Sequence, residues 1–100
     1  VMLVTYKTKK LEKACNNFSF ASKTYGYNIA IKLHTRIDQL IAALSIEELL
    51  RYRIGRCHAL TGNRSGQYAM DLAHPYRLIF EVNICVDIQV YEVIEIIDYH

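Results

Sequence analysis

The hydrophobic periodicity of this sequence changes near Gly55, from a helical to an alternating pattern, and that change limits the folds open to it. Before Gly55, one apolar stripe recurs at helical spacing. Its members are Ile29, Leu33, Ile37, Leu40, Ile41 and Leu44. The stripe predicts a helix over residues 28–44 with one buried face. After Gly55, apolar and polar residues alternate, as in strands covered on one side. The chain therefore pairs a helical first half with a strand-rich second half.

Shorter signals predict the other elements of the first half. Residues 1–7 are β-branched and apolar and predict a strand. A helix should follow from Lys9 to about Cys15, weaken at Asn16-Asn17, and resume until Gly26 stops it. The segment Ser45-Ile-Glu-Glu48 is a capping box, which predicts a short helix to about residue 52.

The second half predicts a meander of strands. We expect strands at residues 58–60, 67–73, 76–82 and 84–99, with the last turn opening at Asn83. The expected fold is α+β, with an N-terminal strand and two to three helices packed on one face of an antiparallel sheet. The opposite face of that sheet would be open to a ligand.

Size and composition limit the class of protein. One hundred residues suit a single domain spanning residues 1–100. No apolar run reaches 18 residues, so no membrane-spanning helix is expected, and no secretory signal is visible. We expect a cytoplasmic protein whose three cysteines, Cys15, Cys57 and Cys85, are free thiols.

The net charge is only +2, but its distribution along the chain is uneven. Residues 1–36 hold six lysines and Arg36 against a single acid, Glu12. Residues 51–77 hold five arginines against Asp71, and residues 78–100 hold five acids without any lysine or arginine. Such blocks usually form solvated surface. An arginine-rich stretch that faces an acidic one also suits a phosphate-binding face or an acidic partner.

Arg64 and Arg77 are the first candidate site residues. Arg77 alternates with Leu78 and Phe80, so it should point to the uncovered face if those two are core. Arg64 lies between Gly62 and Gly66, in a turn where glycines permit close approach of a phosphate. The guanidinium fork matches phosphate oxygens, and two such groups would stabilise a phosphoryl transition state. A lone exposed arginine is about as often without function as it is part of a binding site.

His58 and the chain end, Asp98-Tyr99-His100, are the second group of candidates. The first and last segments of a meander can share a face, so His58 and His100 could transfer protons near neutral pH. Tyr99 could stack on a base. A surface histidine without function is the commoner case, and a sheet-edge tyrosine is as frequent as a stacking one. His34 and His74 are interpreted as structural.

Several known signatures are absent. The sequence contains no phosphate-binding loop, no dinucleotide fingerprint and no hydrolase serine elbow. No carboxylate or Cys/His spacing predicts a metal site. A reaction at the candidate residues would therefore proceed without metal or cofactor.

Three segments together resemble the HigB branch of the RelE/ParE toxin superfamily. They are Arg56-Cys-His-Ala-Leu-Thr-Gly-Asn-Arg-Ser-Gly-Gln-Tyr68, His74-Pro-Tyr-Arg-Leu-Ile-Phe80 and Ile97-Asp-Tyr-His100. The resemblance implies a RelE-like fold over nearly the whole chain. It also implies a toxin of a type II toxin–antitoxin system, a metal-independent, ribosome-dependent mRNA endonuclease.

The resemblance implies a role for each candidate residue. His58 and His100 would transfer protons, with base and acid unassigned, while Arg64 and Arg77 hold the scissile phosphate. Asp98 would orient His100 or the attacking hydroxyl, and Tyr99 would position the nucleotide. Thr61 stands where many relatives have a lysine. This removes a positive charge that Arg56 or Arg64 would have to supply.

The resemblance also implies partners. These are a HigA-type helix-turn-helix antitoxin, the ribosome with its mRNA, and operator DNA reached only through the antitoxin complex. The lysine-rich residues 7–36 would meet an acidic antitoxin surface or ribosomal RNA. Two alternatives stay open: a ParE-like inhibitor of DNA gyrase without nuclease activity, and a catalytically weak antitoxin-binding module.

Overall fold

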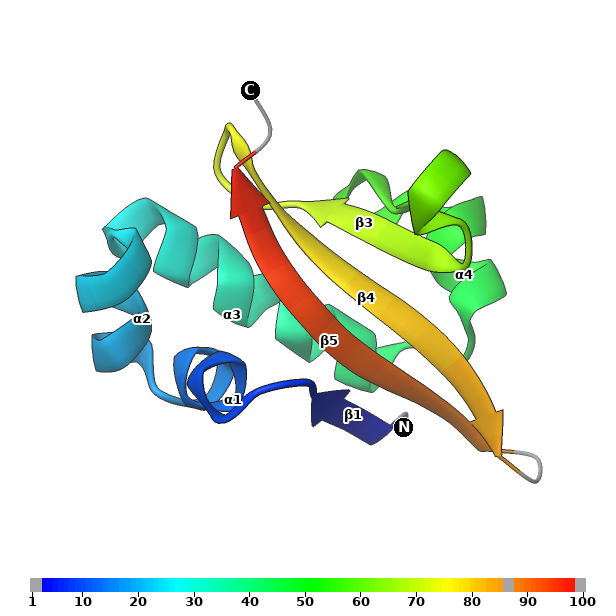
Figure 1. The fold of residues 1–100 in the computed structure, drawn as a ribbon, viewed down its shortest axis with the longest axis horizontal. Coiled ribbons are helices and arrows are strands. Elements are labelled where there is room, and N and C mark those ends of the chain that lie inside the picture. Colours follow the sequence, from blue (N-terminus) through cyan, green and yellow to red (C-terminus); the bar gives the residue numbers. More distant parts are fainter. Residues whose placement is uncertain (1–2, 86–87, 99–100) are drawn as a thin grey trace.

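The structure, a computed structural model, describes residues 3–85 and 88–98. Strand β1 (Leu3–Tyr6) leads into four α-helices, and the other strands follow them (Figure 1). The helices are α1 (Lys9–Asn16), α2 (Phe18–Tyr25), α3 (Tyr27–Ala42) and α4 (Ile46–Arg51). The later strands are β2 (His58–Ala59), β3 (Gln67–Asp71), β4 (Tyr76–Cys85) and β5 (Ile88–Asp98). Two 3₁₀ turns, η1 (Ile54–Arg56) and η2 (Gly62–Arg64), flank β2.

The sheet has the strand order β1-β5-β4-β3-β2. Strands β2 to β5 form the predicted antiparallel meander. Strand β1 pairs in parallel with β5, with Leu3 opposite Val90 and Tyr6 opposite Val93. The α+β class is thus confirmed, whereas the parallel pairing of the first strand with the last was not predicted.

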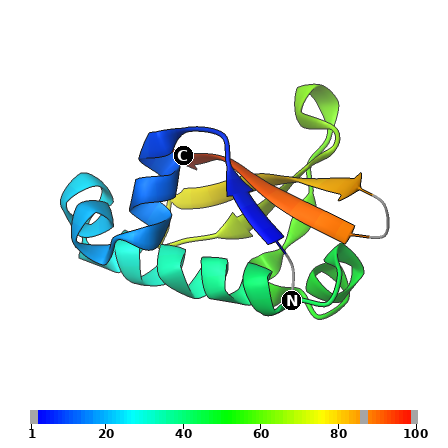
Figure 2. The ribbon, with the colours of Figure 1, turned by 90° about the horizontal axis from the view of Figure 1, so that it is seen from below.

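The core lies between α3 and the sheet. Helix α3 runs along one face, and residues 60–66 rise on the other side (Figure 2). Four residues of the predicted stripe, Ile29, Leu33, Ile37 and Leu40, are buried against strand residues such as Phe80. The other two stripe residues, Ile41 and Leu44, are exposed, which corrects the prediction. Helix α3 ends at Ala42, so Leu44 lies beyond its last turn.

The predicted capping box at Ser45 is confirmed in one of its two hydrogen bonds. Ser45 Oγ accepts a hydrogen bond of 3.3 Å from the backbone N–H of Glu48, whereas Glu48 Oε1 accepts from Leu44 N, one residue before the N-cap, and not from Ser45 N. This cap begins α4, which leads directly into η1 and then into His58. It therefore helps to place the segment that carries His58.

The turn predicted at Asn83 is wrong. Strand β4 continues through Asn83, which lies opposite Val90, and ends at Cys85. Asparagine favours turns, but a strand near the end of a long hairpin tolerates this one because its side chain is exposed. Within the described residues, no helix has the length and apolar character needed to cross a bilayer.

Candidate active site

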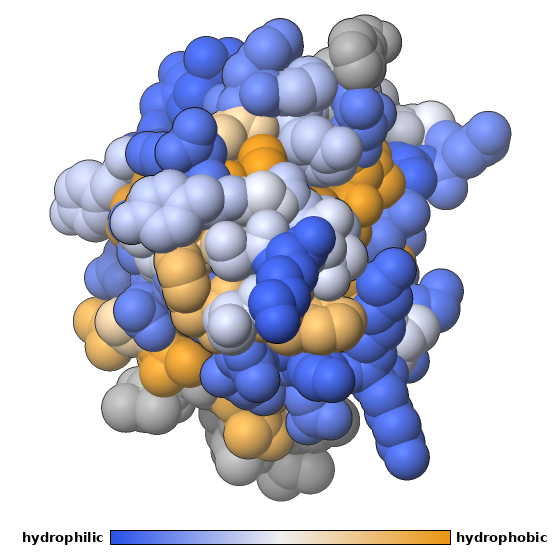
Figure 3. Space-filling model, turned by 90° about the vertical axis from the view of Figure 1, so that its left-hand side faces the viewer, coloured by the Kyte–Doolittle hydropathy of each residue, from blue (hydrophilic) through white to orange (hydrophobic). Residues whose placement is uncertain are grey.

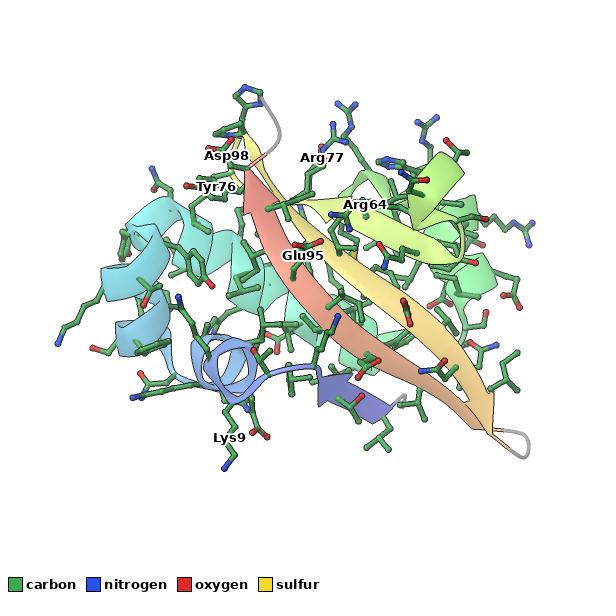
Figure 4. All side chains as sticks on the ribbon, viewed as in Figure 1. Lys9, Arg64, Tyr76, Arg77, Glu95 and Asp98 are labelled. Carbon is green, nitrogen blue, oxygen red and sulfur yellow. The ribbon has the colours of Figure 1, made fainter. Side chains whose placement is uncertain are left out.

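His58, Arg77 and Glu95 lie on the sheet face opposite α3. The register aligns His58, Ala69, Ile79 and Glu95 in one row across β2 to β5. Directly opposite residues present their side chains on the same face. The next row on this face, two residues along each strand, contains Asp71, Arg77 and Ile97. Arg77, Glu95 and Arg64 appear together in front of the sheet in Figure 4.

A bulge in β5 turns Glu95 toward this face. Ile79 lies opposite Glu95 but the next residue of β4, Phe80, lies opposite Val93, so Ile94 is an extra residue. Tyr91 and Val93 are fully buried in the core. An unbroken alternation would send Glu95 the same way, and the bulge re-aims it. The carboxylate therefore reaches the open face instead of the core.

An ion pair between Arg64 and Glu95 spans this face. The distance between Arg64 Nη2 and Glu95 Oε1 is 2.5 Å. Arg64 Nη1 also donates to Gln67 Oε1 at 2.9 Å, and Gln67 Nε2 donates to Glu81. Ala69 and Ile79 are fully buried, although they lie on the face that α3 does not cover. The candidate site thus has an apolar floor with charged groups above it.

Asp71 forms ion pairs with two arginines, Arg56 and Arg77. Its Oδ1 lies 3.5 Å from Arg77 Nε, and its Oδ2 lies 3.2 Å from Arg56 Nε. Its backbone carbonyl accepts a 2.7 Å hydrogen bond from Nε of Arg36, on α3. Arg36 also packs against Gly55, where an added Cβ would lie only 2.7 Å from Arg36 Nε. The site is therefore tied to the helix layer through Asp71.

Sequence reasoning did not select Asp71 or Glu95 as site residues. The signal for Asp71 was present, because it is the single acid among the five arginines of residues 51–77. Glu95 gave no such signal, because its orientation depends on the bulge. Both arginines predicted to hold phosphate are thus paired with carboxylates, so a phosphate would have to compete for them.

His58 has a defined hydrogen-bond partner. Its Nδ1 lies 2.9 Å from the backbone carbonyl oxygen of Arg56. A carbonyl only accepts, so Nδ1 carries the proton, and Nε2 of the neutral ring is the acceptor. His58 lies three strand spacings from Glu95 along its row, roughly 14 Å between Cα atoms.

The chain end is only partly described. Asp98 lies opposite Tyr76, and the pleat places that pair on the other side of β4 and β5 from Arg77 and Ile97. Tyr99 and His100 lie outside the described residues, so their predicted roles stay predictions. Thr61 is exposed at the start of η2.

His34 and Cys57 have surroundings that do not suit catalysis. His34 Nε2 lies 3.0 Å from the carbonyl oxygen of Ala14, which fits a structural role. Burial raises the pKa of the Cys57 thiol, next to His58 in the sequence, to about 12, so it is not a nucleophile at neutral pH. Across residues 3–85 and 88–98, no three His, Cys, Asp or Glu residues form a metal-binding group.

Comparisons with known proteins find solved structures with a fold similar to that of this chain. No family model matches the sequence, and no curated protein matches it. A YoeB/ParE toxin from Agrobacterium tumefaciens shares the fold with a TM-score of 0.59 and 17% identity, over 99% of both chains. A YoeB–YefM complex from Staphylococcus aureus matches with a TM-score of 0.63 and 16% identity, over 100% of this chain and 98% of that one. At such identities the likeness establishes the fold alone.

Proposed function

We propose that this protein is the toxin of a type II toxin–antitoxin pair and that it cuts mRNA on the ribosome without a metal ion. The observation that carries the proposal is the arrangement of His58, Arg64 and Arg77 on one sheet face above an apolar floor. The fold supports it, because both matched structures bear the names of toxins.

The chemistry follows from the positions of the basic groups. His58 Nε2 accepts the proton of the ribose 2′-OH, whose oxygen attacks the adjacent phosphorus. Arg64 and Arg77 neutralise the charge that develops on the phosphoryl oxygens. The P–O5′ bond breaks, leaving a 2′,3′-cyclic phosphate and a 5′-oxygen that must gain a proton. His100 donates that proton, and Tyr99 holds the neighbouring nucleotide. The Asp98 side chain leaves β5 on the other side from Arg77, so Asp98 would act in this step only through His100.

Binding of RNA requires exchange of ion-pair partners. Arg64 and Arg77 are paired with Glu95 and Asp71 in the free protein. Their side chains are about one-third exposed, so these pairs are weak and a phosphate can displace the carboxylates. Arg56, on the same carboxylate as Arg77, supplies the charge that Thr61 lacks.

The proposed partners follow from the same assignment. A HigA-type antitoxin would neutralise the toxin and carry it to operator DNA, and the ribosome would present the mRNA in the cytoplasm. The matched complex of YoeB with YefM supports an antitoxin partner for this fold. Helices α1 and α2 carry Lys9, Lys10, Lys13 and Lys23. The end of the molecule seen in Figure 3 is mostly hydrophilic, with hydrophobic areas between, and such a lysine-bearing surface suits an acidic antitoxin.

Gyrase inhibition is the second candidate function, because one matched structure is described by the names YoeB and ParE together. A protein that only binds gyrase needs no imidazole with an available Nε2, which favours the nuclease. A catalytically weak antitoxin-binding module is the third reading, and the carboxylate-paired arginines keep it open.

Primer extension on a translated message tests the proposal. After induction of the protein, we expect new 5′ ends at discrete positions within translated codons, and none in a message whose start codon has been removed. Intact messages together with trapped gyrase–DNA complexes would establish gyrase inhibition instead. Intact messages and normal growth would favour the third function, that of a catalytically weak antitoxin-binding module.

A further inference from the structure

Two pockets meet at the hairpin turn between β3 and β4. One, of about 170 Å³, is lined by Arg56, Asp71 and Arg77 together with residues of the turn. The other, of about 330 Å³, is lined by Tyr25, Tyr27 and Ile29 together with the turn. His74 and Tyr76 line both. The two pockets therefore adjoin each other along a single short segment.

The first pocket is suited to an anion. Two guanidinium groups, Arg56 and Arg77, approach the single carboxylate of Asp71 from its two oxygens. The side chain of Arg56 is 76% exposed, so its guanidinium can turn toward a ligand at little cost. A planar fork of donors matches phosphate oxygens.

The second pocket is suited to a flat aromatic ligand. Three tyrosines line it, and Tyr27 is 63% exposed. Phe18 packs edge-on against Tyr27 with the ring centroids 5.7 Å apart, which restricts the Tyr27 ring. The Tyr76 backbone is fixed by hydrogen bonds with Leu72 and Ala73. The ring contact of Tyr27 reduces the entropy that this side chain loses on stacking.

Tyr76 and Arg77 connect the two pockets to the candidate active site. They are consecutive in β4, so their side chains leave opposite sides of the strand, as Figure 4 shows. Arg77 lies on the face with His58 and Glu95, while Tyr76 points toward the end formed by α2 and α3.

We propose that the two pockets together bind one nucleotide of single-stranded RNA, next to the nucleotide that is cut. Its phosphate lies between Arg56 and Arg77, and its base stacks in the tyrosine pocket beside Tyr27 and Tyr76. His74, interpreted from sequence as structural, lines both pockets and contacts this nucleotide. The inference rests on the proposed function, since Arg77 serves both the cut and the neighbouring nucleotide.

Binding of a short RNA to the full chain tests the proposal. The probe is a fluorescent eight-nucleotide single-stranded RNA with 2′-O-methyl riboses, which cannot be cut. Tyr27→Ala should weaken its binding about tenfold, while Tyr27→Phe binds as the unchanged protein does. Arg56→Ala should weaken it by a similar factor and reduce the slope of log affinity against log salt by about one.

A matched pair on another surface provides the control. Arg51 lies over the ring of Tyr52, which is 65% exposed, at the end of α4. Arg51→Ala and Tyr52→Ala remove the same chemical groups away from both pockets, and should leave RNA binding unchanged. Equal losses in the control and test pairs would overturn the proposal, because binding would then depend on general surface charge and aromatic content.

Cleavage on programmed ribosomes separates this inference from the proposed function. Tyr27→Ala should raise the toxin concentration for half-maximal cleavage and leave the rate at saturation within about twofold. Arg56→Ala should raise that concentration as well. If both variants bind and cut as the unchanged protein does, the nucleotide subsite is refuted and the nuclease proposal stands. If the unchanged protein neither binds nor cuts RNA, both proposals fail. Loss of antitoxin binding alone would assign the pockets to the antitoxin and overturn the inference.

Discussion

Arg64 and Glu95 form an ion pair that passes over two buried residues of the intervening strands. Arg64 comes from the turn before β3, and Glu95 comes from β5, on the far side of β4. Ala69 and Ile79, the residues of β3 and β4 in the same row as Glu95, are fully buried and are not part of the core cluster under α3. The pair therefore ties the Arg64 guanidinium to β5 in the free protein.

Glu95→Gln should strengthen the binding of RNA. The carboxylate competes with phosphate for Arg64, and the amide removes that competition along with one negative charge. A pair exposed to this degree contributes about 1 kcal/mol or less, so we expect an affinity gain of up to about fivefold. Fluorescence anisotropy at two salt concentrations measures it, and Glu47→Gln, on the exposed side of α4, is the control. A loss of binding would mean that Glu95 holds Arg64 in place for RNA.

Arg77→Ala should relieve growth arrest and leave the fold intact. The change removes a donor from the proposed phosphate site, while Asp71 keeps Arg56 as a partner. The unfolding free energy should fall by about 1 kcal/mol or less, because the pair is partly exposed. Deletion of His100 should relieve arrest in the same way. Both variants should still bind the antitoxin in a pull-down.

Arg51→Ala is the matched arginine control for this experiment, and should stay as toxic as the unchanged protein. If well-expressed Arg77→Ala and His100 deletion variants both arrest growth fully, the assignment of the site is wrong. Loss of antitoxin binding in either variant would point to misfolding, which circular dichroism would confirm.

Arg36→Ala should destabilise the protein. Its Nε donates a 2.7 Å hydrogen bond to the Asp71 carbonyl, and its Nη1 donates to Gln39. Loss of a charged donor to a part-buried carbonyl costs about 1–2 kcal/mol. The melting temperature should fall by several degrees, as a domain of this size loses about 4–8 °C per kcal/mol. Lys32→Ala, one turn away and exposed on α3, should leave it unchanged.

Cys15 and Cys57 should resist alkylation in the folded protein. Burial raises the pKa of each thiol to about 12, so at pH 8 the reactive thiolate is scarce. Iodoacetamide followed by peptide mass spectrometry should label both cysteines only after unfolding. Rapid labelling of Cys57 in the native protein would contradict its buried position.

The same pKa shifts predict a loss of stability in alkali. A thiol whose pKa is raised by folding loses its proton first in the unfolded chain, so a rise in pH favours the unfolded state. The unfolded thiol ionises from about pH 8.5 upward, whereas the folded thiol stays protonated to about pH 12. Ionisation of the unfolded chain lowers its free energy, and the folded state loses relative stability across that range. Denaturation in urea at pH 8 and pH 10.5 should therefore give a lower unfolding free energy at the higher pH. Equal unfolding free energies at pH 8 and pH 10.5 would show that these thiols are accessible in the folded protein.

Much of the architecture could be predicted because local signals agree with it. The apolar stripe of α3, the Ser45 cap and the alternation around Leu78 and Phe80 each depend on neighbours in the sequence. The parallel pairing of Leu3 with Val90 could not be predicted, because it joins strands far apart in the sequence and neither carries a signal for the other. The prediction of a turn at Asn83 failed because the pairing of Asn83 with Val90 outweighs the weak turn preference of asparagine.

The candidate site was predicted less completely for a related reason. The placement of His58, Arg64 and Arg77 near one face follows from alternation and turn chemistry, whereas the orientation of Glu95 depends on one extra residue, Ile94. No short-range pattern marks such a bulge. The carboxylate partners of both arginines therefore emerged only from the strand register.

The position of β5 between β1 and β4 has a consequence for biosynthesis. The segment with the highest residue numbers among the described elements is also the one that the first strand pairs with in the sheet. A nascent polypeptide that has not yet exposed residues 88–98 can form neither the β1 pairing nor the Arg64 bridge. Synthesis must therefore pass residue 98 before the proposed nuclease surface can form.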